Sequence, residues 1–145
     1  MSRYEWLLFL HVLAAFALVA AIVIFATLLV TARSGPDDAP LLRISWLGSR
    51  LWEVGTLGTV VFGVWLAIDS PPPINYDFFD GWIIAALVLW FVASGAGSQV
   101  VSAYAEVRAG GGLAALRTPR ATSQQVVMIL TATLLLVDMI FKPGA

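Results

Sequence analysis

The residue with the widest range of chemistry in this sequence is His11, its only histidine, which lies within a long apolar segment. An imidazole exchanges a proton near neutral pH and is a common ligand of haem iron. Asp138 is the one acidic residue of the last apolar segment. If both segments are helices that meet the same membrane surface, His11 lies roughly 8 Å and Asp138 about 5 Å below it. This depth predicts that the two side chains pair across two helices; the alternatives are a purely structural hydrogen bond or separate hydration near the headgroups.

A second set of polar residues belongs to the middle segments. Arg50 and Glu53 are three positions apart, so on a helix they share one face and can form a local ion pair, while Arg50 extends to the membrane surface. The alternative is that Glu53 faces Ser98 and Gln99 of the next segment, in a polar pocket open to the cytoplasm. Because His11 and Glu53 are expected in opposite leaflets, they do not form one acid–base pair.

Small residues recur every four positions in the second and third apolar segments. They are Gly55, Thr59 and Gly63 in the second and Ala93 and Gly97 in the third. Such faces let helix backbones approach closely where lipid provides no hydrophobic driving force. We therefore expect these two faces to contact each other; a partner subunit or a flat cofactor would be the alternative neighbour.

Composition determines which elements must position these residues. Hydrophobic residues make up 60% of the 145 residues and charged residues only 12%, about half the charge of a typical soluble domain. The apolar residues form four blocks, each close to the ~20 residues that a helix needs to cross the hydrocarbon. Backbone inside lipid must satisfy its own hydrogen bonds, so these blocks are helices. The sequence predicts an all-α, four-helix membrane bundle, one domain over residues 1–145 with spans at about 6–30, 46–68, 82–104 and 125–141.

The connections and their charges predict the orientation. Six of the eight basic residues flank the first and third connections: Arg33, Arg43, Arg50, Arg108, Arg117 and Arg120. The second connection has three aspartates and no basic residue. By the positive-inside rule, the first and third connections are cytoplasmic and both termini lie outside. The short connections predict an up-down-up-down bundle in the cytoplasmic membrane.

Proline and glycine mark the expected ends of the helices. Gly35 and Pro36 end the first, residues 71–73 are three prolines that end the second, and Thr118 with Pro119 has the pattern of an N-cap and first turn at the start of the fourth. A short turn is expected near Leu113, just before that cap.

Several classes of function are disfavoured. The chain has no cysteine and therefore no thiolate metal site, and its net charge of −1 gives no electrostatic basis for binding nucleic acid. The sequence has no phosphate-binding glycine loop, paired catalytic carboxylates or nucleophile elbow, and we predict no catalytic or metal site. A single histidine also excludes two-histidine haem ligation within one chain.

The first apolar segment opens with Tyr4-Glu5-Trp6-Leu7-Leu8-Phe9-Leu10-His11-Val12-Leu13-Ala14-Ala15. This segment, with the four spans, the basic first connection and Glu53, resembles an uncharacterised family of bacterial four-helix inner-membrane proteins, domain of unknown function 2269. The Leu-His-Val-Leu stretch also resembles the first helix of copper-resistance D-type proteins and haem-associated protoporphyrinogen oxidases. That resemblance implies a role of His11 in haem or metal handling. The other histidines and the lysine-bearing signature of the oxidases have no counterpart here, so their activity is not implied.

These observations leave three functional hypotheses. The first is a small non-catalytic accessory subunit that binds a membrane protein partner or a second copy of the chain. The second is a haem b-binding or redox protein with His11 as axial ligand and Asp138 as its hydrogen-bonding partner. The third is movement of a solute or proton along a polar path. It is disfavoured because apolar helix separates His11 from Glu53, which are expected in opposite leaflets.

Overall fold

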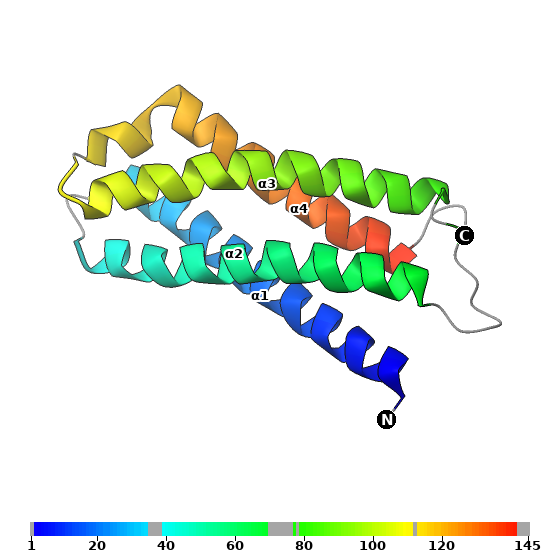
Figure 1. Ribbon diagram of the computed structural model, residues 1–145. Coiled ribbons are helices and arrows are strands. Elements are labelled where there is room, and N and C mark those ends of the chain that lie inside the picture. The colour runs from blue at the N-terminus through cyan, green and yellow to red at the C-terminus, as the bar shows by residue number, and fades with distance from the viewer. Residues whose placement is uncertain (1, 35–38, 70–76, 78, 112, 142–145) are drawn as a thin grey trace.

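The computed structural model describes residues 2–34, 39–69, 77, 79–111 and 113–141, and every element in these ranges is helical. Figure 1 shows the four long helices. In chain order the elements are α1 (Arg3–Ser34), α2 (Ala39–Ile68), α3 (Gly81–Arg108), the short 3₁₀ helix η1 (Leu113–Arg117) and α4 (Pro119–Phe141). The all-α, four-helix prediction is confirmed.

All four long helices have the length and apolarity needed to cross a membrane. Their outward faces carry large apolar side chains, for example Phe16, Phe91 and Ile140, which are 67%, 75% and 74% exposed. A soluble monomer rarely exposes so much continuous apolar surface, whereas hydrocarbon solvates it. The chain therefore has the character of a multi-pass membrane protein.

Each helix extends beyond the apolar block that predicted it. The second begins at Ala39 rather than near residue 46, and the fourth at Pro119 rather than near residue 125. The turns added to α4 are mostly polar, and a helix continues into them because its backbone bonds are satisfied internally in water as well as in lipid. At the start of α4 the predicted cap is confirmed, since the Thr118 hydroxyl accepts a hydrogen bond from the Ala121 N–H at 3.2 Å. Residues 35–36 and 71–73, which were expected to end the first two helices, lie outside the described residues.

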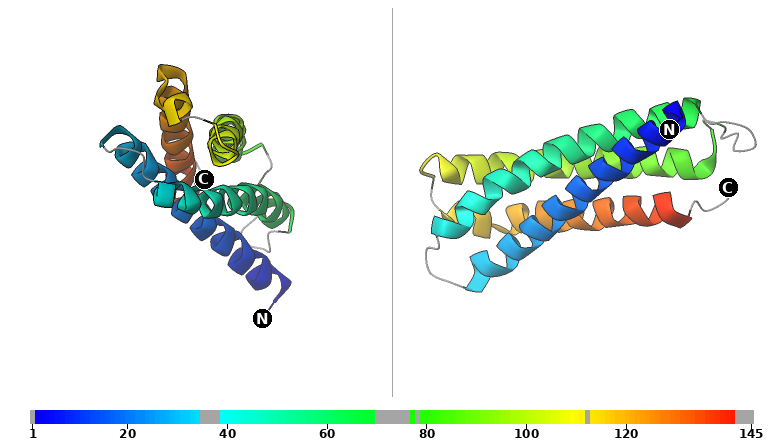
Figure 2. Two further views of the ribbon diagram at one scale, coloured as in Figure 1. Left: turned by 90° about the vertical axis from the view of Figure 1, so that its left-hand side faces the viewer. Right: turned by 90° about the horizontal axis from the view of Figure 1, so that it is seen from below.

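The helices associate mainly as two neighbouring pairs, α1 with α2 and α3 with α4. Figures 1 and 2 show that α1 crosses α2 obliquely, so that its first half lies away from α3 and α4. At this end of the bundle, the Arg3 end, the start of α1 meets the end of α2 through an ion pair of 3.3 Å between Arg3 and Asp69. At the opposite end, the Arg108 end, the Arg108 guanidinium donates to the Ser45 hydroxyl at 2.8 Å, which links α3 to the start of α2.

The glycine stripe of α2 packs against α1, and our expectation that it would face α3 was wrong. A methyl group at Gly55 would lie 2.7 Å from the Leu18 backbone nitrogen, and one at Gly63 would lie 3.0 Å from Cε1 of His11. Thr59, between them, is buried and directs its hydroxyl to the Gly55 carbonyl at 2.8 Å. Periodic small residues reveal that a face is close-packed without revealing which neighbour packs against it.

The small-residue face of α3 does contact α2, but it receives a large side chain. Gly97 lies directly under the indole ring of Trp52, and Ala93 is also buried. Trp90 adds a polar link between the same helices, because its indole N–H donates to the Thr56 carbonyl at 2.8 Å. Here the absent glycine side chain makes room for a tryptophan rather than for a backbone.

Candidate functional site

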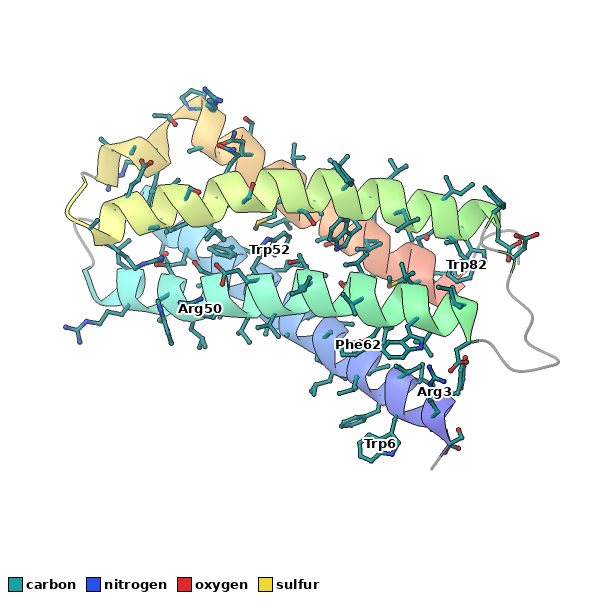
Figure 3. All side chains as sticks on the ribbon, viewed as in Figure 1. Arg3, Trp6, Arg50, Trp52, Phe62 and Trp82 are labelled. Atoms are coloured by element: carbon teal, nitrogen blue, oxygen red, sulfur yellow. The ribbon has the colours of Figure 1, made fainter. Side chains whose placement is uncertain are left out.

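The Arg3 end of the bundle contains a cavity of about 470 Å³ that is lined by residues of all four long helices. The residues of this end that Figure 3 labels include Arg3 on α1 and Trp82 on α3; Trp82 lines the cavity. The walls are almost entirely apolar, with Phe16, Leu135 and Met139 among them. The volume and apolar lining are typical of a small-molecule or cofactor site.

His11 is the main polar side chain of this cavity, and its Nδ1 edge is turned toward α2. Because Gly63 has no side chain, the imidazole lies against the α2 backbone, and the Thr59 backbone is the hydrogen-bonding group nearest to the ring. Nδ1 is completely enclosed, yet within the described chain it has no partner that meets hydrogen-bond geometry. A hydrogen bond from Nδ1–H to the neighbouring Thr59 backbone would fix the proton on this nitrogen.

The other ring nitrogen of His11 is Nε2, and only Nδ1 is found among the enclosed, unpartnered side-chain atoms of the described residues. His11 lines the cavity, so Nε2 is the nitrogen that a molecule in the cavity would meet. With the proton on Nδ1, Nε2 carries a free lone pair. A histidine that ligates a metal typically has this arrangement, with its other N–H directed at a backbone carbonyl or carboxylate. The site therefore offers one preoriented lone pair inside an apolar cavity.

Asp138 is buried but forms no hydrogen bond or ion pair with His11. It is buried, at 9% exposure, on the face of α4 that also buries Gln125, Met128, Ala132 and Leu135. It does not line the cavity, and within the described residues its Oδ2 atom has no hydrogen-bond partner. The structure contains no bond between this atom and Nδ1 of His11. The α2 backbone at Gly63 lies against the Nδ1 edge of the imidazole.

The cavity reaches the outer surface of the bundle. Val12 and Phe16 on α1 and Ile140 on α4 line it and are also 42%, 67% and 74% exposed. A side chain that both lines a cavity and faces outward stands at the rim of an opening. These positions lie within helices that are long and apolar enough to cross a membrane.

The second set of polar residues predicted from the sequence does not line this cavity; its members are Arg50, Glu53, Ser98 and Gln99. Arg50 and Glu53 form the local ion pair at 3.0 Å, with both side chains more than half exposed, and Arg50 lies over the Trp46 ring at 6.0 Å. Ser98 donates back to its own helix at Gly95, and Gln99 is exposed. These contacts support the ion pair over the polar pocket.

Sequence reasoning missed a buried polar cluster toward the Arg108 end. The Gln125 side-chain amide donates to the Phe25 carbonyl and lies 3.4 Å from the Tyr104 hydroxyl, so it links α4 to both α1 and α3. Gln125 is 4% and Tyr104 is 2% exposed. Both residues stand at the boundaries of apolar blocks, where a polar side chain normally indicates a span end. The only signal for a buried role was that Gln125 shares one helical face with Met128 and Ala132.

Comparison with known proteins gives no further guide to this site: no protein-family model matches the chain, and no similar curated protein or solved structure is found.

Proposed function

We propose that this chain is a haem b-binding protein of the cytoplasmic membrane, crossing it up-down-up-down with both termini outside. His11 would be the axial ligand through Nε2, in the cavity at the Arg3 end. The single observation that carries the proposal is the imidazole of His11 in the wall of a large apolar cavity. The basic residues around the first and third connections support the orientation.

The apolar lining of the cavity supports such a cofactor. A porphyrin ring needs apolar walls, and Phe16, Trp90 and Leu135 provide them from three helices. Its iron needs a neutral imidazole with a fixed tautomer, which the Thr59 backbone beside Nδ1 would select. When bound, haem would supply one-electron or oxygen chemistry, and His11 would fix the iron while the walls exclude water.

The accessory-subunit hypothesis loses one of its arguments. It rested partly on two small-residue faces available for a partner, but Gly55 and Gly63 contact α1, and Gly97 contacts Trp52 of the same chain. Gentle extraction followed by mass analysis of the intact complex tests it directly. A stoichiometric membrane partner with no bound chromophore would favour the accessory role over haem binding.

The absorption spectrum of the purified protein tests the haem proposal. After expression with ample haem supply, we expect a Soret band and the pyridine haemochrome of haem b. The His11→Ala variant should lose or shift the Soret band, whereas Gln99→Ala, a change at an exposed site outside the cavity, should leave it unchanged. Absence of a Soret band from the well-folded wild-type protein would rule the proposal out.

A further inference from the structure

A planar group held by His11 has a second face, and the cavity supplies one sulfur atom from another helix. His11 belongs to α1, whereas Met139 lies two residues before the end of α4 and also lines the cavity. Met139 is partly buried and packs against the core of the bundle. Its thioether is a soft ligand of the kind that binds haem iron opposite a histidine.

The direction of the Met139 side chain suits this role. Long side chains on a helix lean toward its N-terminus, and for Met139 this direction is away from the nearby helix end and into the bundle. The imidazole of His11 lies at the level of Gly63, which is five residues before the end of α2. Figure 1 shows that α2 and α4 end at the same side of the bundle. Gly63 and Met139 both lie close to those ends, and His11 and Met139 line the same cavity.

Other residues of the described cavity lining are less suited to bind iron on the face of the ring opposite His11. Tyr4 has a phenol that could bind iron, but it lies on α1, the helix of His11, and a single helix cannot readily place ligands on both faces of one ring. Trp82 and Trp90 carry indole nitrogens, which donate a hydrogen bond but offer no lone pair. Asp138 does not line the cavity.

We propose that Met139 is the second axial ligand, so that the cavity holds haem iron between His11 Nε2 and Met139 Sδ. This inference rests on the proposed function. Histidine–methionine ligation stabilises the reduced iron and gives a higher reduction potential than other common axial pairs. It would make the site a six-coordinate electron carrier rather than an open site for oxygen.

The test compares two methionine-to-leucine variants of nearly unchanged volume. In Met139→Leu we expect haem content to be retained, the ferric spectrum to change from low-spin to high-spin, the thioether-to-iron charge-transfer band to disappear and the midpoint potential to fall. Met128→Leu is the matched control, because Met128 is fully buried in the core of α4 and does not line the cavity. It should keep the wild-type spectrum and potential.

The outcomes separate this inference from the proposed function. A wild-type Soret band with a spectrum and potential unchanged in Met139→Leu would overturn methionine ligation and leave haem binding standing. Rapid carbon monoxide binding by the reduced wild-type protein, at the rate of Met139→Leu, would also overturn methionine ligation. Absence of a Soret band in the wild type would rule out both methionine ligation and haem binding.

Discussion

The two ends of this bundle are held together by different means. At the Arg108 end, buried polar groups join helices that are far apart in the sequence: Gln125 bonds to the Phe25 carbonyl, and Arg108 bonds to Ser45. At the Arg3 end, the ion pair between Arg3 and Asp69 is substantially exposed and joins only α1 to α2. The cavity lies at this second end.

The difference follows from how helices associate in lipid. Lipid chains are as apolar as leucine side chains, so close backbone packing and buried hydrogen bonds decide where helices hold together. Gly55 and Gly97 provide close packing in the middle of the bundle, and Gln125 provides the buried bonds toward one end. The first half of α1 is packed closely only against α2, which leaves space for a ligand between the two helix pairs.

The largest loss of unfolding free energy is expected when the closely packed middle of the bundle is disturbed. In Gly97→Ala the added methyl group would overlap the indole of Trp52, which is 3% exposed and has little room to move. Overpacking of this kind costs about 1–3 kcal/mol or more. Tryptophan fluorescence during unfolding in mixed detergent micelles measures the loss of unfolding free energy.

Gly95→Ala is the matched control for this substitution, since a methyl group at Gly95 would meet nothing within 4 Å. Its unfolding free energy should stay within about 0.5 kcal/mol of wild type. Equal effects of the two substitutions would show that α3 does not pack on Trp52.

A smaller effect is expected when the buried bonds of the Arg108 end are removed. Gln125→Leu keeps the volume roughly constant and deletes the contacts with the Phe25 carbonyl and the Tyr104 hydroxyl. We expect a loss of about 0.6–2 kcal/mol of unfolding free energy, measured in the same micelles. The control is Gln124→Leu on the neighbouring, partly exposed face, which should be neutral. A stabilised Gln125→Leu variant would mean that the cluster specifies helix arrangement without contributing to stability.

Gly63→Ala probes the Arg3 end and should separate stability from binding. Its methyl group would lie 3.0 Å from Cε1 of His11, and the imidazole can yield toward the cavity. We expect less than about 1 kcal/mol of destabilisation, the lower end of overpacking costs, together with a marked loss of haem at equal protein yield. Destabilisation as large as that of Gly97→Ala would show that the Arg3 end is packed as tightly as the middle.

The smallest effect should come from the exposed ion pair. Asp69→Asn removes a partner of Arg3 whose side chain is 36% exposed, while Arg3 itself is 67% exposed. Such pairs contribute about 0–1 kcal/mol and are screened by salt. The difference from wild type should therefore shrink as ionic strength rises, and a difference that is independent of salt would indicate a role beyond the ion pair.

The sequence predicted those features that depend on local patterns. Apolar blocks gave the four helices, the Thr118-Pro119 pair gave the start of α4, and the spacing of Arg50 and Glu53 gave their ion pair. Each of these depends on neighbours within a few residues, where helix geometry fixes the outcome.

Contacts between helices were harder to predict. The glycine stripe of α2 has the same periodicity whether it faces α1 or α3, and the depth of His11 does not determine its rotation about the helix axis. The sequence therefore predicts a pairing of Asp138 with His11, whereas in the structure neither Asp138 Oδ2 nor His11 Nδ1 has a hydrogen-bond partner among the described residues. Gln125 has the polarity of a span boundary, and only tertiary packing places it inside the bundle.

The Gln125–Phe25 contact also bears on how the protein is made, because it joins residues 100 positions apart in the chain. The pairs α1–α2 and α3–α4 are consecutive in sequence, so each can associate as soon as its second helix has been inserted. Gln125 belongs to α4, and its bond to Phe25 of α1 can form only after all four of these helices are present. This contact thus marks the docking of the two hairpins.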